Sequence, residues 1–173
     1  MFALIKYKYL LFSIVICSAS NVVAQHSPHA TSRQQFDFWI GEWELSWKDP
    51  QKGMVKGKNV ITKEMNDKVI HEHFSDPVNN YFGASWSVYD TLIGKWKQTW
   101  VDDQGSYLDF RGEFKDGKMT LQREYTSSGG KLVRQRMTFY NISNHRLDWV
   151  WEGSTDNGAS WNELWKIEYV RKK

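Results

Sequence analysis

The amino-acid sequence predicts an all-β protein, an antiparallel up-and-down barrel of about ten strands. From Phe36 onward the chain repeats one design, in which a run of strand-forming residues ends in a cluster of Gly, Asn, Asp, Ser or Pro. No segment carries the long apolar stripe of helical period that predicts an amphipathic helix, and only Ser32 to Phe38 suits a turn of helix. Because the connections are short, consecutive strands are expected to pair antiparallel, and closure into a barrel removes the exposed sheet edges.

The first 24 residues differ from the rest and are predicted to be a secretory signal peptide. Lys6 and Lys8 form a basic head, and the apolar run from Leu10 to Cys17 is too short to span a membrane as a helix. The mature chain is therefore expected to be periplasmic or secreted, with no integral membrane segment after cleavage. Residues 25–35 are polar and are expected to form a flexible leader ahead of a single β-barrel domain, residues 36–171.

Composition argues against several classes of function. Removing the first 24 of the 173 residues leaves 149, the size of one domain with a substantial core. The only cysteine, Cys17, lies in the predicted signal peptide, so the exported domain is expected to have no disulfide. The signal peptide also carries two of the 23 basic residues, which leaves 21 against 20 acidic ones. This balance gives no indication of binding to nucleic acid or to an acidic membrane.

Ten runs of strand type follow one another along the chain. They are Ile40 to Trp47, Met54 to Glu64, Lys68 to Ser75, Tyr81 to Asp90, Trp96 to Asp102, Tyr107 to Phe114, Met119 to Thr126, Leu132 to Asn141, Arg146 to Gly153 and Trp161 to Val170. The segments between them have turn chemistry: Pro50 and Pro77 each lie in one of these turns, and Asp116-Gly117 is a strong hairpin signal.

Side chains alternate between the two faces of a strand, and this alternation predicts which residues line the barrel. Trp43, Leu45 and Trp47 share one face of the first strand and are expected inside. Trp96 and Trp100 share one face of the fifth run in the same way. An interior rich in tryptophan is therefore expected, while Trp39, which precedes the first strand, is expected to plug the end of the barrel.

Four polar residues fall on the same faces as aromatic ones. Alternation places Gln98, Arg123 and Glu163 in rows that also contain Trp or Tyr. The run from Lys68 to Ser75 is ambiguous, since its two faces are both partly apolar, and we expect the face with Ile70, Glu72 and Phe74 to point inward.

Polar groups within an aromatic lining are typical of a ligand pocket. The candidate ligand-binding residues are Glu72, Trp86, Gln98, Trp100, Arg123, Glu163 and Trp165. A second interpretation stays open, in which an inward Arg and an inward Glu neutralise each other as a buried structural pair and bind no ligand.

The last connection, Ser154 to Trp161, matches the Asp-box pattern Ser-x-Asp-x-Gly-x-x-Trp. In such a hairpin Asp156 accepts backbone N–H bonds, Gly158 takes a special φ and Trp161 packs beneath the turn. The pattern resembles the Asp boxes of sialidase propellers, but one copy gives no propeller repeat. We interpret it as structural.

No catalytic, metal or cofactor site is predicted. His71 and His73 share one strand face and could offer two nitrogen ligands to a metal or to haem iron, but no third ligand is positioned by the sequence, so a solvated face is favoured. The mature chain has no cysteine, and no Gly-x-Ser-x-Gly elbow occurs. Acid–base chemistry stays open, because a carboxyl group such as Glu72 or Glu163 among tryptophans would have a raised pKa.

Several motifs carry a family resemblance. The opening Phe36-Asp37-Phe38-Trp39-Ile40-Gly41-Glu42-Trp43 and the run Lys95 to Asp102 resemble a family of secreted bacterial domains of unknown function that open with Phe-Asp-Phe-Trp-x-Gly-x-Trp. The resemblance covers about Gln35 to Val170 and implies a calycin-like or lipocalin-like barrel. It also implies that Trp43 closes the base of the barrel, as in the Gly-x-Trp element of lipocalins. It implies no catalytic residues.

These observations lead to one preferred function and two alternatives. The preferred one is an exported lipocalin-like barrel that binds a small apolar or aromatic ligand in its interior. The alternatives are an isomerase, cyclase or lyase that uses a buried carboxyl group, and a secreted structural module without a ligand. The sequence does not determine the ligand or the oligomeric state.

Overall fold

The computed structural model describes residues 31–173, so the predicted signal peptide and most of the predicted leader lie outside the described residues. Two short 3₁₀ helices, Ser32–Gln34 and Asp37–Trp39, come first. The strands that follow are β1 (Gly41–Asp49), β2 (Gly53–Glu64), β3 (Val69–Asp76), β4 (Tyr81–Asp90), β5 (Lys95–Asp102), β6 (Tyr107–Lys115), β7 (Lys118–Thr126), β8 (Leu132–Tyr140), β9 (Arg146–Ser154) and β10 (Asn162–Arg171). Every predicted strand is found, with ends that differ by at most two residues.

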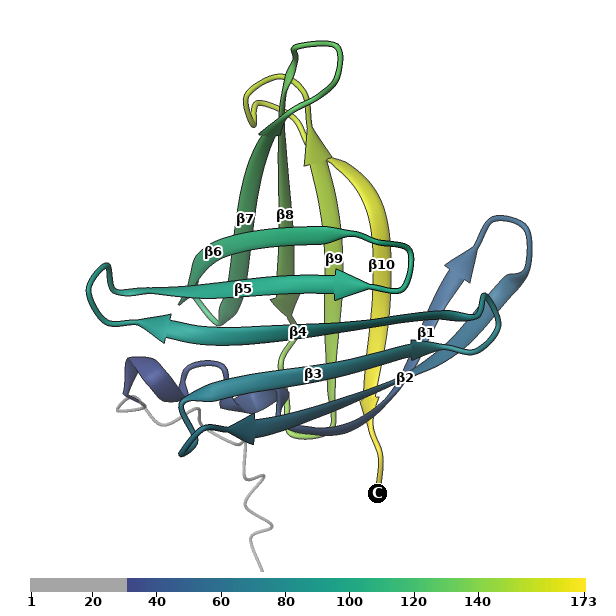
Figure 1. Cartoon of the computed structure of the whole chain (residues 1–173). Coiled ribbons are helices and arrows are strands. Elements are labelled where there is room, and N and C mark those ends of the chain that lie inside the picture. Colours follow the sequence, from purple (N-terminus) through teal and green to yellow (C-terminus); the bar gives the residue numbers. More distant parts are fainter. Residues whose placement is uncertain (1–30) are drawn as a thin grey trace, which may run out of the picture.

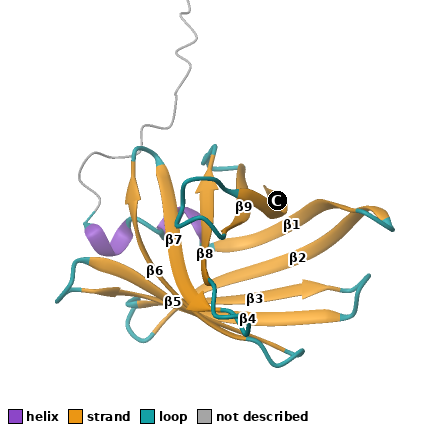
Figure 2. Ribbon diagram, turned by 90° about the horizontal axis from the view of Figure 1, so that it is seen from above, coloured by secondary structure: helices purple, strands orange, loops and turns teal. Residues whose placement is uncertain are grey.

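Each strand pairs antiparallel with its neighbours in sequence, and β1 pairs with β10 to close the barrel. The predicted all-β, up-and-down barrel is therefore confirmed, and it is consistent with a calycin-like or lipocalin-like architecture. In Figure 1, β2–β6 cross in front of the upright strands β7–β10. Both views show only short loops between strands, drawn teal in Figure 2.

The wall of the barrel is continuous near the helices and splits toward the opposite end. β1 and β10 pair only along Trp43–Ser46 and Glu168–Arg171. β6 and β7 pair only along Arg111–Lys115 and Lys118–Gln122. Because these strands diverge beyond the paired segments, the barrel has a closed end at the helices and an open end opposite.

Aromatic side chains plug the closed end. Phe36 and Trp39 are fully buried and stack with ring centroids 5.0 Å apart, and Phe139 meets Trp39 edge-on at 5.0 Å. Trp43, Leu45 and Trp47 are buried as alternation predicts. The indole Nε1 of Trp43 donates to the carbonyl of Trp39 at 2.7 Å, so plug and first strand are joined. The prediction that Trp39 plugs the barrel is confirmed.

Arg171 holds the closed end together. Its guanidinium lies 4.1 Å from the ring centre of Trp43 and donates to the carbonyls of Phe38 and Ile40. Gly41 makes this approach possible, since a Cβ atom there would lie 2.2 Å from a guanidinium nitrogen of Arg171, and its φ of +130° is one that other residues rarely adopt. The Gly-x-Trp element is thus half of a clamp that Arg171 completes from β10.

We expect a Gly41→Ala variant to be destabilised by about 2 kcal/mol or more, because the new methyl group meets both a strained φ and the guanidinium. Urea unfolding followed by tryptophan fluorescence measures this. Gly53→Ala is the matched control: Gly53 also has a positive φ, but a Cβ there meets no atom within 4 Å. An equal loss of stability in both variants would contradict the role of the Arg171 clamp.

Candidate functional site

The barrel contains a cavity of about 170 Å³ between the aromatic plug and the open end. Its floor includes Trp39, and its upper rim includes Asp102 and Gln104. The other lining residues are Glu72, Phe74, Tyr81, Gln98, Trp100, Ser106, Leu108, Phe110, Met137, Phe139, Trp149, Trp151, Trp165, Ile167 and Tyr169. Aromatic rings therefore form most of the wall, and a few polar groups interrupt it.

Glu72 is the buried carboxyl group of the cavity. Its Oε1 accepts a hydrogen bond from Asn59 Nδ2 at 2.7 Å, and its Oε2 accepts one from Ser85 Oγ at 2.5 Å. Burial raises the pKa of Glu72 to about 7, although the bonds from Ser85 and Asn59 act in the opposite direction. Both charge states of this carboxyl group are therefore populated near neutral pH.

Neutral groups surround Glu72. Asn59 also donates to the hydroxyl oxygen of Tyr169 at 3.3 Å. Burial, and then the neighbouring Glu72 carboxylate, raise the pKa of Tyr169 above its ordinary range, so this phenol stays protonated. On the next inward row, Gln98 Nε2 donates to Ser87 Oγ at 2.9 Å. Glu72 thus has two hydrogen-bond donors and no cation among its recorded partners in the described chain.

A second carboxyl group, Asp102, lies at the rim. Its Oδ2 accepts hydrogen bonds from Trp100 Nε1 and from the Tyr81 hydroxyl, both at 3.0 Å. Its Oδ1 accepts the backbone N–H groups of Gln104 and Ser106. Partial burial raises the pKa of Asp102, but these donors outweigh burial and bring the pKa to about 2. Asp102 is therefore a carboxylate at any physiological pH.

Gly83 allows Trp100 to take its place at the rim. A Cβ atom at Gly83 would lie 2.1 Å from Cζ2 of the Trp100 ring, so the indole lies directly on the backbone of β4. Only glycine permits such a close approach. The contact positions the Trp100 indole N–H on Asp102.

A surface cleft of about 670 Å³ adjoins the cavity where β1 and β10 diverge. Tyr81, Gln104 and Trp165 line both spaces. The cleft also contains Lys48, Lys166 and other charged residues, in contrast to the aromatic cavity. A ligand group inside the barrel can therefore continue into a more polar exterior.

Four of the predicted ligand-binding residues, Glu72, Gln98, Trp100 and Trp165, line the cavity together. The predicted inward direction of Ile70, Glu72 and Phe74 is also confirmed, since all three are buried. Trp86, Arg123 and Glu163 do not line it.

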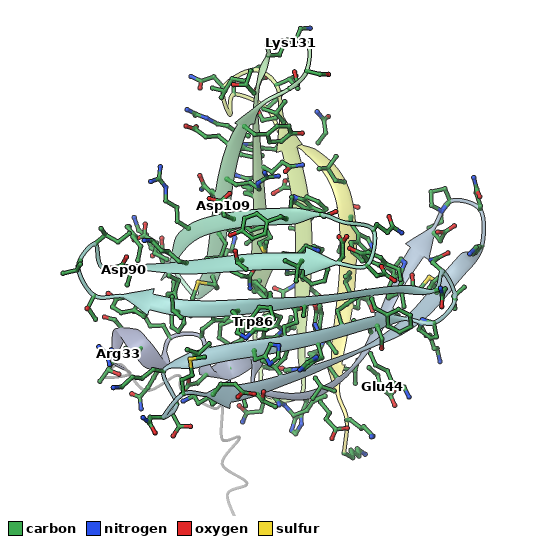
Figure 3. The ribbon with its side chains drawn as sticks, in the orientation of Figure 1. Arg33, Glu44, Trp86, Asp90, Asp109 and Lys131 are labelled. Carbon is green, nitrogen blue, oxygen red and sulfur yellow. The ribbon has the colours of Figure 1, made fainter. Side chains whose placement is uncertain are left out.

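Trp86 points outward. It is 38% exposed and stacks on His71, with ring centroids 4.4 Å apart, on the outer face of β3 and β4 (Figure 3). Its strand neighbours Ser85 and Ser87 occupy the inward positions and are fully buried. Two small serines inside, rather than the large ring, leave space for the cavity and for the side chains of Glu72 and Gln98.

Glu163 is exposed, and the prediction that it faces inward is wrong. The β9–β10 register shifts between Glu163 and Trp165, so that Glu163 pairs with Glu152 while Trp165 pairs with Trp151. A bulge of one residue reverses the alternation. Trp165 therefore points into the cavity, and Glu163 lies in the outer cleft.

Arg123 is half-buried where β6 and β7 separate. Its Nη1 donates to Gln135 Oε1 at 3.0 Å, and its guanidinium lies 4.8 Å from the ring centre of Tyr125 and 5.8 Å from that of Phe110. No ion pair between Arg123 and Glu72 is recorded in the described chain, so the alternative of a neutralised buried pair does not hold.

Sequence reasoning missed Asp102, Tyr81, Trp149 and Trp151 as lining residues, whereas Tyr169 shares the row in which it expected Trp165 to face inward. One signal was present: the alternation that predicts Gln98 and Trp100 inside continues to Asp102. Alternation also puts Trp149 and Trp151 on one face of β9, and their pairing with Ile167 and Trp165, both after the bulge, shows that this face points inward.

The Asp-box hairpin has the hydrogen bonding predicted for it. Asp156 accepts the backbone N–H and the hydroxyl of Ser160, and these bonds lower the pKa of Asp156. Arg136 lies 4.1 Å from the ring centre of Trp161 and bonds Glu152. On the outer face, His71 Nδ1 lies 3.6 Å from Glu64 Oε1, and no three His, Cys, Asp or Glu residues among the described ones group as metal ligands.

A comparison of the chain with protein-family models and with curated proteins finds no match. In residues 31–173, none of the helices has the length and apolar character needed to cross a membrane.

We expect the Glu72→Gln variant to have a flatter dependence of stability on pH than the wild type. The pKa of Glu72 is raised from 4.5 to about 7 in the folded state, so its protonation stabilises the fold below pH 4.5 and this contribution is lost as pH rises to about 7. The difference is on the order of 3 kcal/mol. Urea unfolding across this range measures it, with the exposed Glu44→Gln as control (Figure 3). If stability depends on pH in the same way in the wild type and in Glu72→Gln, burial does not raise the pKa of Glu72.

A Gly83→Ala variant should displace the Trp100 indole, weaken its bond to Asp102 and cost about 2 kcal/mol, because the methyl group overlaps the ring. The ¹H–¹⁵N resonance of the Trp100 indole reports the displacement. Gly153→Ala is a milder control in β9, since its Cβ would meet only the flexible end of Leu164 at 3.2 Å. An unchanged indole resonance in Gly83→Ala would show that the position of Trp100 does not depend on glycine at position 83.

Proposed function

We propose that this protein is an exported barrel that binds one small apolar or aromatic ligand in its interior. The observation that carries this proposal is the cavity itself, in which ten aromatic side chains surround Glu72 and Gln98. A binding site of this kind combines apolar area with a few polar groups that fix orientation. A barrel built only as a structural module would instead be expected to fill its interior with side chains.

The volume of the cavity limits the size of the bound group. An engineered apolar protein cavity of about 150 Å³ takes up benzene, and the cavity here measures about 170 Å³. The group inside the barrel is therefore about as large as one six-membered ring. Larger ligands would place the remainder in the adjoining cleft, past Tyr81 and Trp165.

Export and family membership belong to the same proposal. They rest on the predicted signal peptide and on the Phe-Asp-Phe-Trp-x-Gly-x-Trp opening, whose Gly41 and Trp43 form the clamp with Arg171. Sequencing of the N-terminus of the exported protein tests the first point, and a mature chain that begins at Gln25 is expected.

A specific observation favours a second candidate, an enzyme that uses Glu72 as general acid or base. A catalytic carboxyl group works best with a pKa near the working pH, and the pKa of Glu72 is about 7. The test is turnover of a bound compound. A Glu72→Gln variant that converts this compound at the wild-type rate would exclude the candidate.

Binding is tested by titration of a panel of single-ring and short-chain compounds, read by tryptophan fluorescence and by ¹H–¹⁵N NMR. Five tryptophans line the cavity, so occupancy should change the emission. We expect Leu108→Trp to abolish binding because the larger side chain fills the cavity, while the variant stays folded. Tyr107→Trp, on the exposed side of the same strand, should bind as the wild type does. Unchanged binding in Leu108→Trp would place the ligand elsewhere.

A further inference from the structure

The charges in the cavity all have one sign. Its lining, taken entirely from the described part of the chain, contains two carboxyl groups, Glu72 and Asp102, and no Lys, Arg or His. Arg123, which does not line the cavity, bonds Gln135 and approaches the rings of Tyr125 and Phe110. The basic residues of the outer cleft, Lys48 and Lys166, are not part of the cavity lining.

The aromatic wall, like the two carboxyl groups, favours a positively charged ligand. The face of an aromatic ring carries negative potential and attracts cations, most strongly in tryptophan. Five tryptophans, two tyrosines and three phenylalanines line the cavity. Such a set of rings, without a competing positive side chain, has the composition of an aromatic cage for an ammonium group.

The two carboxyl groups lie at different places along this wall. Asp102 is a carboxylate at the rim and retains its negative charge, since its hydrogen-bond donors, among them Trp100 and Tyr81, are neutral. Glu72 lies deeper and has only the neutral donors Asn59 and Ser85. A buried carboxyl group in a purely structural role is normally paired with a cation. Here the protein supplies none among its recorded partners.

We propose that the ligand of the cavity is a small organic cation, a protonated amine or a quaternary ammonium ion. This inference rests on the proposed binding function and specifies its ligand class. An anionic ligand would meet two carboxyl groups, whereas an ammonium group meets ring faces and a counter-charge.

Protonation of Glu72 should compete with the cation. The groups that face Glu72 are Asn59 from β2, Ser85 from β4 and the Tyr169 hydroxyl from β10, and none of them is charged at neutral pH. Asp102, elsewhere in the lining, stays ionised throughout. If only the ionised form of Glu72 binds well, affinity should rise about tenfold from about pH 6 to about pH 8.

The test compares choline with its neutral carbon isostere, 3,3-dimethylbutan-1-ol, by isothermal titration calorimetry on the protein without its signal peptide. We expect choline to bind at least about tenfold more tightly. Glu72→Gln and Asp102→Asn should each weaken choline about fivefold or more, with the isostere changed less than about twofold. Glu163→Gln removes a carboxylate from the outer cleft only and serves as the matched control.

Each outcome of these titrations supports or overturns the cation proposal. Equal or tighter binding of the isostere would overturn the cation proposal and leave the binding function intact. Binding of neither compound, while neutral single-ring compounds still bind, would also overturn it. If nothing in either panel binds, the proposed function fails as well. A variant that fails to fold binds neither choline nor the isostere. In that case the comparison of the two compounds on the wild-type protein decides the cation proposal.

Discussion

The clamp between Arg171, Trp43 and Gly41 is the contact on which the rest of the molecule depends. β1 and β10 pair along only four residues, so the seam that closes the barrel is short. Arg171 lies at this seam, covers the Trp43 ring and bonds the carbonyls of Phe38 and Ile40. One side chain from the last strand therefore joins the seam, the plug and the first strand. Without this closed end, neither the cavity floor at Trp39 nor the opposite opening would be defined.

The packed rings of the closed end also explain why the polar side chains of the cavity, Glu72 and Gln98, lie above the plug. The plug consists of the aromatic side chains Phe36, Trp39 and Phe139, each at most 1% exposed. The two serines of β4 then leave room for Glu72 and Gln98 above it. Burial of a carboxyl group without a cation is unfavourable for stability. That the fold contains one, facing a cavity, supports a role in binding or catalysis rather than in stability.

Alternation along the strands predicted most of the interior, including Glu72, Gln98, Trp100 and Trp165. It failed at Glu163 because a bulge shifts the register of β10, and bulges leave little trace in the local pattern. Alternation also did not predict that Arg123 lies outside the cavity. That side chain lies on the inward face of β7, but at a point where β6 has already diverged. Trp86 was a candidate for the cavity because it is large and aromatic, but such a residue is also compatible with the outer face of a strand, where Trp86 lies.

The fold class, the number of strands and the strand ends to within two residues can be predicted from the sequence, because turn residues and two-residue periodicity are local properties of the chain. The sequence also predicts that the interior is rich in tryptophan. Which charged groups line the cavity depends on the tertiary structure. Asp102 and Glu72 come from different strands, and Arg123 is separated from them by the divergence of β6 and β7. The net charge of a cavity depends on register and on the splitting of strands, which are long-range consequences of closing the barrel.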